Sequence, residues 1–92
     1  MIESFHCKDT EALFSGKRVK RFANIETIAQ RKLQQLDSAV TLAFLRSPPG
    51  NRLEALSGDR VGQHSIRIND QCRLCFIWNE GKPKAVEIVD YH

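Results

Sequence analysis

The sequence lacks any apolar run of the roughly eighteen residues that a helix needs to cross a bilayer. Its first residues, MIESFHCKD, include acids and a histidine instead of a basic segment followed by an apolar one, so we expect no signal peptide and no membrane partner. No repeat, low-complexity tract or linker interrupts the chain. At 92 residues it has no room for two domains, and we expect a single cytoplasmic domain over residues 1–92.

Cysteine is scarce, and the three present form an odd set, which argues against a disulfide framework. Cys72 and Cys75 have the C-x-x-C spacing of metal and redox sites. They lie in the stretch QCRLCFIW, which has the composition of a strand, and a three-residue step along a strand points two side chains to opposite faces. We therefore interpret them as small buried side chains, and we predict no metal site and no other cofactor.

The positive charge is unevenly distributed. The net charge is +3, but the first 50 residues hold eight Lys or Arg against five acids, whereas the remainder holds six of each. Most of the excess lies in one short cluster, Lys17, Arg18, Lys20 and Arg21. Such a cluster favours a polyanion, most commonly nucleic acid, and it is equally compatible with a solvated loop.

The first half of the chain has helical patterns. Asp9 is placed to cap a short helix through Phe14, with Gly16 to end it, and residues 17–21 have no apolar period and indicate a loop. Asn24 is the expected cap of a longer helix, because apolar residues recur after it at three- and four-residue steps: Ile25, Ile28, Ala29, Leu33 and Leu36. Thr41 can cap a further turn through Leu45.

The second half predicts strands and turns. Beyond a short strand over 2–5, we expect strands over 52–56, 64–68, 73–78 and 85–89, with hairpin signals at Asn69-Asp70 and Asn79-Glu80-Gly81. The class is therefore α+β, with an antiparallel sheet covered on one face by the N-terminal helices. The other face would present Arg67 and Arg73.

Two features of this second half suggest chemistry on a phosphodiester. Arg67 and Arg73, on adjacent strands and one face, would form a two-pronged phosphate clamp. The sequence Asp90-Tyr91-His92 offers a carboxylate, an aromatic ring and an imidazole able to transfer protons near neutral pH. The alternative is structural: the arginines would form ion pairs with Glu54, Glu87 or Asp90, and His92 would be frayed. His6 and His64 are weaker candidates.

The stretch from Ser47 to Asp70, SPPGNRLEALSGDRVGQHSIRIND, followed by CRLCFIW and VEIVDYH, resembles HigB-type toxins of the RelE/ParE superfamily. These toxins share a PPGNRLE-L-GDR-G-WSIR-ND-WR-CF pattern and the same Asp-Tyr-His ending. The opening MIESF and the helix ending in LQQLDSA also fit, so the resemblance covers essentially the whole chain. It implies a RelE-like fold and an endoribonuclease that cuts mRNA in the ribosomal A site.

The resemblance also implies roles for individual residues. Arg67 and Arg73 would contact the scissile phosphate, Asp90 and His92 would share the acid and base roles, and Tyr91 would stack on or orient the base. Arg60, in the GDR motif, and the basic cluster would add contacts to RNA phosphates.

The chain departs from the family at several positions. Glu54 and Ser57 stand where some members have histidine and lysine, so Glu54 could replace that histidine as a base, provided that Arg67 or Arg73 neutralises it. Cys72 and His64 stand where tryptophans are usual, and we interpret both as packing changes.

The resemblance further implies partners besides the ribosome and mRNA. We expect a HigA-like helix-turn-helix antitoxin, in a complex of two toxins with one antitoxin dimer, which would reach operator DNA through the antitoxin. Two alternatives remain. One is a ParE-like toxin that poisons gyrase without RNase activity, and the other is a non-catalytic ribosome- or RNA-binding module.

Overall fold

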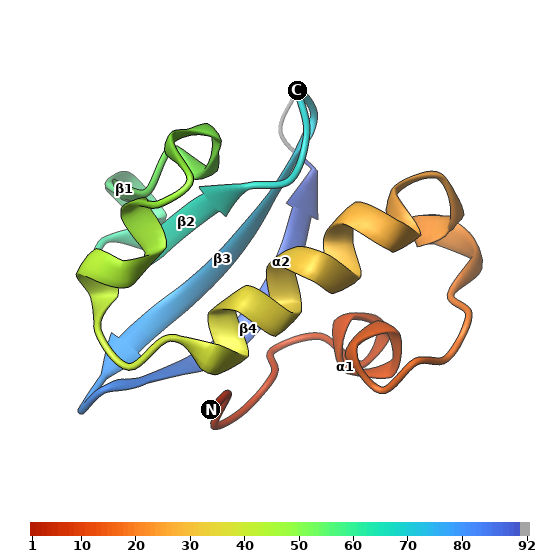
Figure 1. Cartoon of the computed structure of the whole chain (residues 1–92), viewed down its shortest axis with the longest axis horizontal. Coiled ribbons are helices and arrows are strands. Elements are labelled where there is room, and N and C mark those ends of the chain that lie inside the picture. The colour runs from red at the N-terminus through yellow and green to blue at the C-terminus, as the bar shows by residue number, and fades with distance from the viewer. Residues whose placement is uncertain (91–92) are drawn as a thin grey trace.

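The computed structural model describes residues 1–90, and its helices lie on one face of a four-stranded antiparallel sheet (Figure 1). The helices are α1 (Lys8–Phe14) and α2 (Glu26–Ser38), and the strands are β1 (Glu54–Ala55), β2 (His64–Arg67), β3 (Cys72–Asn79) and β4 (Lys82–Asp90). Short 3-10 turns cover Lys20–Ile25, Leu42–Arg46, Pro49–Asn51 and Gly58–Arg60. The predicted α+β class with helices before the sheet is confirmed.

The helices were placed well from the sequence, but two of their caps were not. Asp9 lies inside α1 instead of capping it, and Gly16, at φ +90°, follows its end as predicted. Asn24 does not cap α2, because it lies within the 3-10 turn Lys20–Ile25, whose buried Phe22 and Ile25 hold that segment against the core. That turn also shortens the predicted loop over 17–21. The turn capped by Thr41 is confirmed, since Phe44 N donates to Thr41 Oγ1 (3.2 Å).

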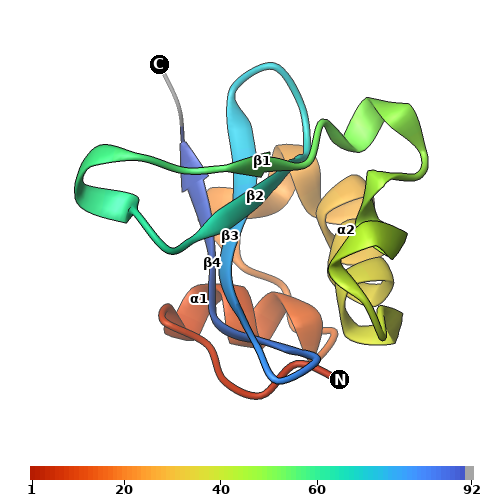
Figure 2. The same ribbon diagram turned by 90° about the vertical axis from the view of Figure 1, so that its left-hand side faces the viewer.

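Helix α2 lies against one face of the sheet (Figures 1 and 2), and one side of its apolar stripe is buried. Its fully buried residues are Ala29, Leu33 and Leu36, whereas Ile28, predicted on the same face, is 37% exposed. The opposing sheet residues are Ile66, Leu74, Phe76, Val86 and Ile88. The core therefore lies between α1, α2 and one face of the sheet, and the burial of these apolar side chains is the main stabilising contribution.

The strands are joined in chain order, as β1-β2-β3-β4. The β3–β4 hairpin turns through Glu80 (φ +50°) and Gly81 (φ +78°), the two left-handed residues that a tight hairpin requires. A bulge follows, because the register shifts between Cys75 and Ile77 where Ala85 adopts φ +52°.

Two predicted strands are largely absent. Strand β1 is only two residues long instead of spanning 52–56, since Arg52 adopts the left-handed conformation (φ +46°). Residues 2–5 form a single parallel bridge, Phe5 to Val86, and so flank β4 without forming a strand.

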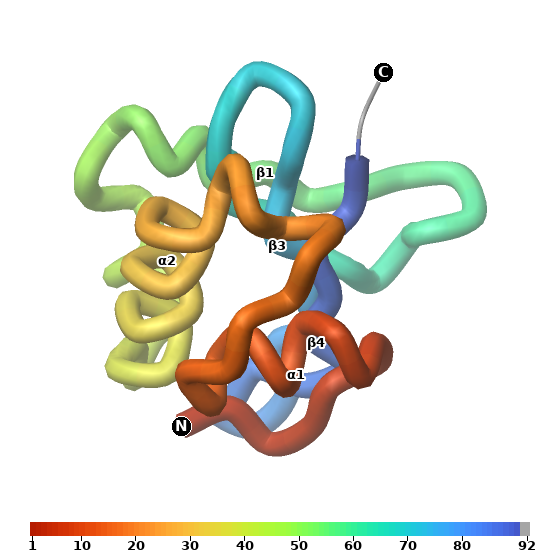
Figure 3. The backbone as a smooth tube through the Cα atoms, turned by 90° about the vertical axis from the view of Figure 1, so that its right-hand side faces the viewer, coloured from red at the N-terminus to blue at the C-terminus, as the bar shows by residue number. Residues whose placement is uncertain are grey.

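The segment between α1 and α2 passes the C-terminal end of β4 (Figure 3). Arg21 of the basic cluster lines the same cleft as Asp90. Within residues 1–90, no helix combines the length and apolar character needed to span a membrane.

Candidate functional site

Arg67 and Arg73 are direct partners in the β2–β3 ladder, so their side chains lie on the same face of the sheet. The alternating neighbours Ile66 and Leu74 are fully buried in the core, which places the arginines on the face away from α2. This predicted juxtaposition is confirmed.

Arg73 is held tightly within this face. Its side chain is only 11% exposed, its Nε donates to Ser65 Oγ (2.7 Å), and its Nη2 donates to the Arg52 carbonyl (2.7 Å). The same Nη2 lies 3.1 Å from Glu54 Oε1. Arg73 is thus pre-positioned by neutral acceptors, with a carboxylate on its accessible side.

Glu54 reaches Arg73 from the edge of the sheet. It pairs with Ser65 in the β1–β2 ladder, which puts its side chain on the arginine face. Its side chain is 55% exposed. The ion pair supplies the neutralisation that a carboxylate needs beside a phosphate site.

Arg67 is more open than Arg73 and also has a carboxylate partner. Its side chain is 34% exposed, and its Nη2 donates to Oδ1 of Asp70, whose side chain is 94% exposed. Asp70 lies in the β2–β3 turn, which Asn69 orders by accepting hydrogen bonds from Gln71 N and Cys72 N. Each arginine of the pair therefore has one exposed acid beside it.

Asn51 is a supporting residue that sequence reasoning missed. It is fully buried, and its Nδ2 donates to Gln35 Oε1 (3.0 Å) and the Leu45 carbonyl (3.1 Å). Its Oδ1 accepts from Lys32 Nζ (2.5 Å). These contacts hold the PPGN turn on α2, and the next residue, Arg52, provides the carbonyl that Arg73 contacts. An asparagine directly after Pro-Pro-Gly was the available signal.

The ammonium of Lys32 adds positive charge near Arg67. Burial lowers the pKa of Lys32, and the neighbouring charges of Arg31 and Arg67 lower it further. Positive charge therefore extends from the arginine face towards α2.

Asp90 does not share the arginine face. It pairs with Cys72 in the β3–β4 ladder, and the next pair along is Arg73 with Val89, so Asp90 and Arg73 point to opposite faces. Burial and the charge of Asp90 raise the pKa of the Cys72 thiol. Tyr91 and His92 lie outside the described residues.

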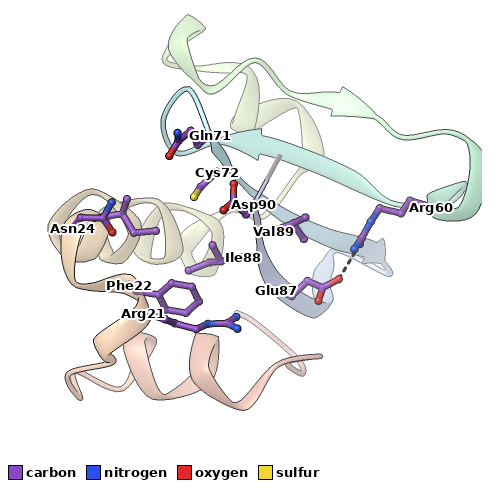
Figure 4. A pocket seen from close by; sticks show the side chains of 11 residues that line it. Arg21, Phe22, Asn24, Arg60, Gln71, Cys72, Glu87, Ile88, Val89 and Asp90 are labelled. Atoms are coloured by element: carbon purple, nitrogen blue, oxygen red, sulfur yellow. Dashed lines mark hydrogen bonds and ion pairs between the residues drawn. The ribbon is translucent and has the colours of Figure 1, made fainter. Parts of the chain in front are cut away.

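Asp90 borders a cleft of about 500 Å³ along the outer edge of β4, which Ile88 and Asp90 line from one face of the sheet and Glu87 and Val89 from the other (Figure 4). The cleft lies between the end of β4 and the basic segment, with Arg21, Phe22, Asn24, Gln71 and Cys72 among its lining residues. Asp90 is therefore not the ion-pair partner of Arg73 that the structural alternative allowed, and its acid or base role stays a prediction.

Arg60 forms an ion pair with Glu87. Its Nη1 donates to Glu87 Oε1 (2.8 Å) and to Gln63 Oε1 (3.0 Å), and Figure 4 shows the pair at one side of the cleft. The ion pair joins the Gly58–Arg60 turn to β4. Arg60 thus has a structural task, and its contact with RNA stays a prediction.

The basic cluster divides in two. Lys17, Arg18 and Lys20 are exposed. Arg21 instead forms an ion pair with Asp9 (Nε to Oδ2, 3.3 Å), and its Cζ lies 4.5 Å from the centroid of the Phe22 ring. The first three are available to a polyanion.

Cys72 and Cys75 lie on opposite faces of β3, as predicted, but only Cys75 has the predicted burial. Cys75 is fully buried on the arginine side of β3, and Cys72 is half-buried on the helix side. Among residues 1–90, no group of three His, Cys, Asp or Glu side chains is placed to hold a metal ion.

Comparisons with known proteins agree with this architecture. The sequence model of one family, described as the RelE-like toxin of the type II toxin–antitoxin system HigB, matches residues 3–92. The chain is 49% identical over 59 residues to "Toxin HigB-1" of Vibrio cholerae serotype O1, covering 64% of this chain and 62% of that protein. It is 37% identical over 54 residues to an uncharacterised protein of Haemophilus influenzae, covering 59% of this chain and 54% of that protein. The matches thus span less than two thirds of each relative's length.

Proposed function

The chain belongs to the RelE-like toxins of the HigB type II toxin–antitoxin system, and we propose that it cuts mRNA on the ribosome without a metal ion. The observation that carries this proposal is the cross-strand pair of Arg67 and Arg73 with Glu54 on the same face. Two guanidinium groups suit a phosphodiester, and a carboxylate beside them suits a proton acceptor.

The proposed reaction is transfer within the RNA chain. The 2′-hydroxyl oxygen attacks the adjacent phosphorus, the bond from phosphorus to the 5′-oxygen breaks, and a 2′,3′-cyclic phosphate and a 5′-hydroxyl result. A base takes the 2′-hydroxyl proton, an acid gives a proton to the departing 5′-oxygen, and the cations stabilise the charge on the phosphate.

We assign proton abstraction to Glu54, because it is the carboxylate beside Arg73 on the arginine face. When a phosphate takes its position on the guanidinium, Glu54 would remain next to that phosphate and would accept the proton of the 2′-hydroxyl. Arg73 would hold the scissile phosphate, with Arg67 beside it on the neighbouring strand. For Asp90, Tyr91 and His92 we retain the roles that the resemblance implies: proton transfer for Asp90 and His92, and stacking on a base for Tyr91. Asp90 lies on the face opposite Arg73, so its role in proton transfer would require the RNA to pass around the end of β4, where the cleft is lined by residues of both faces.

Binding partners follow from the family. We propose that a helix-turn-helix antitoxin neutralises the toxin and that ribosomes are its place of action in the cytoplasm. The exposed Lys17, Arg18 and Lys20 would contribute long-range attraction to ribosomal RNA.

The proposal is tested with purified ribosomes and a defined mRNA. Incubation with the protein should yield fragments with 5′-hydroxyl ends at codons in the A site. The same mRNA without ribosomes should remain intact. A parallel assay of gyrase supercoiling examines the ParE-like alternative. Intact mRNA on ribosomes together with inhibited gyrase would overturn the nuclease and support that alternative, and intact mRNA with bound ribosomes would support a binding module.

A further inference from the structure

The two arginines on the open face each have an exposed acid beside them in the free protein. Glu54 lies against Arg73 from strand β1, and Asp70 lies against Arg67 from the β2–β3 turn. The two acids come from different elements, so the pattern does not follow from one local turn.

The burial of the four groups is asymmetric. Arg73 and Arg67 are 11% and 34% exposed, whereas Glu54 and Asp70 are 55% and 94% exposed. Arg73 is held by Ser65 and Arg52, and each acid is more exposed than the arginine that it contacts. An anion approaching from solvent meets the carboxylates first.

Glu54 and Asp70 can be displaced from the arginines without destabilising the core. Neither is buried, and an ion pair at a surface contributes little to stability because water screens it. Arg73 would keep its place, since Ser65 Oγ and the Arg52 carbonyl accept hydrogen bonds from it independently of Glu54.

We propose that Glu54 and Asp70 occupy the positions on Arg73 and Arg67 that two successive RNA phosphates take, so that substrate binding is an exchange of carboxylates for phosphates. The inference rests on the proposed function and adds a selectivity element to it. Free RNA in solution must displace both acids, whereas mRNA held by a ribosome presents its phosphates at high effective concentration. The acids thereby favour ribosome-held RNA over free RNA.

The test measures binding without cleavage. A 2′-O-methyl RNA oligonucleotide has no nucleophilic hydroxyl, and its affinity for the whole protein is measured by fluorescence anisotropy at low and at physiological salt. Glu54→Gln and Asp70→Asn should each bind about fivefold more tightly than wild type at low salt, the upper range for an exposed ion pair. This gain in affinity over wild type should become smaller at higher salt concentration, because salt screens the charges.

Matched controls separate this exchange from a general change in net charge. Asp59→Asn and Glu80→Gln each remove one negative charge from an exposed acid that belongs to neither of these two ion pairs. They should leave the affinity close to that of wild type.

A double-mutant cycle shows whether the acids act through the arginines. Arg67 is partly exposed, so Arg67→Gln should fold, and the gain from Asp70→Asn should vanish in that background. The inference is overturned if Glu54→Gln and Asp70→Asn bind no more tightly than the two controls, or if the Asp70→Asn gain persists without Arg67. Neither result depends on mRNA cleavage, so failure of the nuclease assignment is recognised separately in the ribosome assay.

Discussion

Arg73 and Asp90 lie on opposite faces of the sheet although they belong to neighbouring strands. The register pairs Arg73 with Val89 and Cys72 with Asp90, and alternate residues of a strand point to alternate faces. The carboxylate that contacts Arg73 is instead Glu54, which comes from β1. This relationship changes which group is best placed to take the proton of the 2′-hydroxyl.

Replacing Glu54 with glutamine should slow cleavage of ribosome-bound mRNA by about 10²-fold, because the amide cannot accept the proton. Single-turnover kinetics at saturating toxin isolate this step from binding, which the same substitution should strengthen. Asp59→Asn, in the nearby turn, is the matched control and should cut at the normal rate. Full activity of Glu54→Gln beside an inactive Asp90→Asn would assign the base role to Asp90.

Asn51→Ala should lower the free energy of unfolding by about 3 kcal/mol, because the buried carbonyls and the Lys32 ammonium lose their partner. Urea denaturation followed by circular dichroism measures the change. Asn24→Ala is the comparison, since Asn24 is exposed and caps no helix, and it should change stability by less than about 0.5 kcal/mol. Equal effects of the two substitutions would contradict the role of Asn51 in holding the PPGN turn.

The Cys72 thiol should resist alkylation in the folded protein at mildly alkaline pH. Burial first, and the charge of Asp90 second, raise its pKa, so the thiolate forms at higher pH than in the unfolded chain. Iodoacetamide labelling across a pH series, read by mass spectrometry, gives the midpoint. Asp90→Asn should move that midpoint to lower pH, but not as far as the value of the unfolded chain, because burial still raises the pKa of Cys72. No movement would mean that Asp90 and Cys72 are not neighbours.

Ala85→Gly should stabilise the protein by about 0.5 to 1 kcal/mol. Ala85 adopts a left-handed conformation at φ +52°, which costs an alanine about 1 to 2 kcal/mol and costs glycine little. The greater chain entropy of glycine when unfolded offsets part of the gain. Thermal unfolding of Ala85→Gly and of Ala55→Gly should shift in opposite directions, because Ala55 lies in a strand of ordinary conformation. If both variants unfold at a lower temperature than wild type, the bulge at Ala85 is unstrained.

Local patterns predicted most of the fold. Helix α2 follows from apolar residues at three- and four-residue steps, and the β3–β4 hairpin follows from Asn79-Glu80-Gly81. The caps were wrong because tertiary contacts outweighed local propensity: burial of Phe22 and Ile25 draws Asn24 into a 3-10 turn. The extent of β1 was overestimated because the left-handed Arg52 is set by the turn before it, which Asn51 anchors to α2.

The candidate site was only partly predictable for a similar reason. Strand alternation places Arg67 and Arg73 on one face, and the register confirms it. Alternation along β4 does not reveal whether Asp90 lies on the same face as Arg73. That depends on the β3–β4 register, which a bulge near Ala85 shifts. The ion pair of Arg73 with Glu54 is one that the structural alternative named, whereas the partner of Arg67 is Asp70, which sequence reasoning did not name.

The central claim, that the arginine face holds the scissile phosphate, is tested most directly by the single-turnover rate at which Arg73→Gln cuts mRNA on purified ribosomes. Circular dichroism and the denaturation midpoint establish that the variant is folded, and Arg31→Gln, an exposed arginine on α2, is the control. Loss of one such charge-stabilising group should slow cleavage by about 10² to 10³-fold, with Arg31→Gln unchanged. A folded Arg73→Gln that cuts at the wild-type rate would contradict the account.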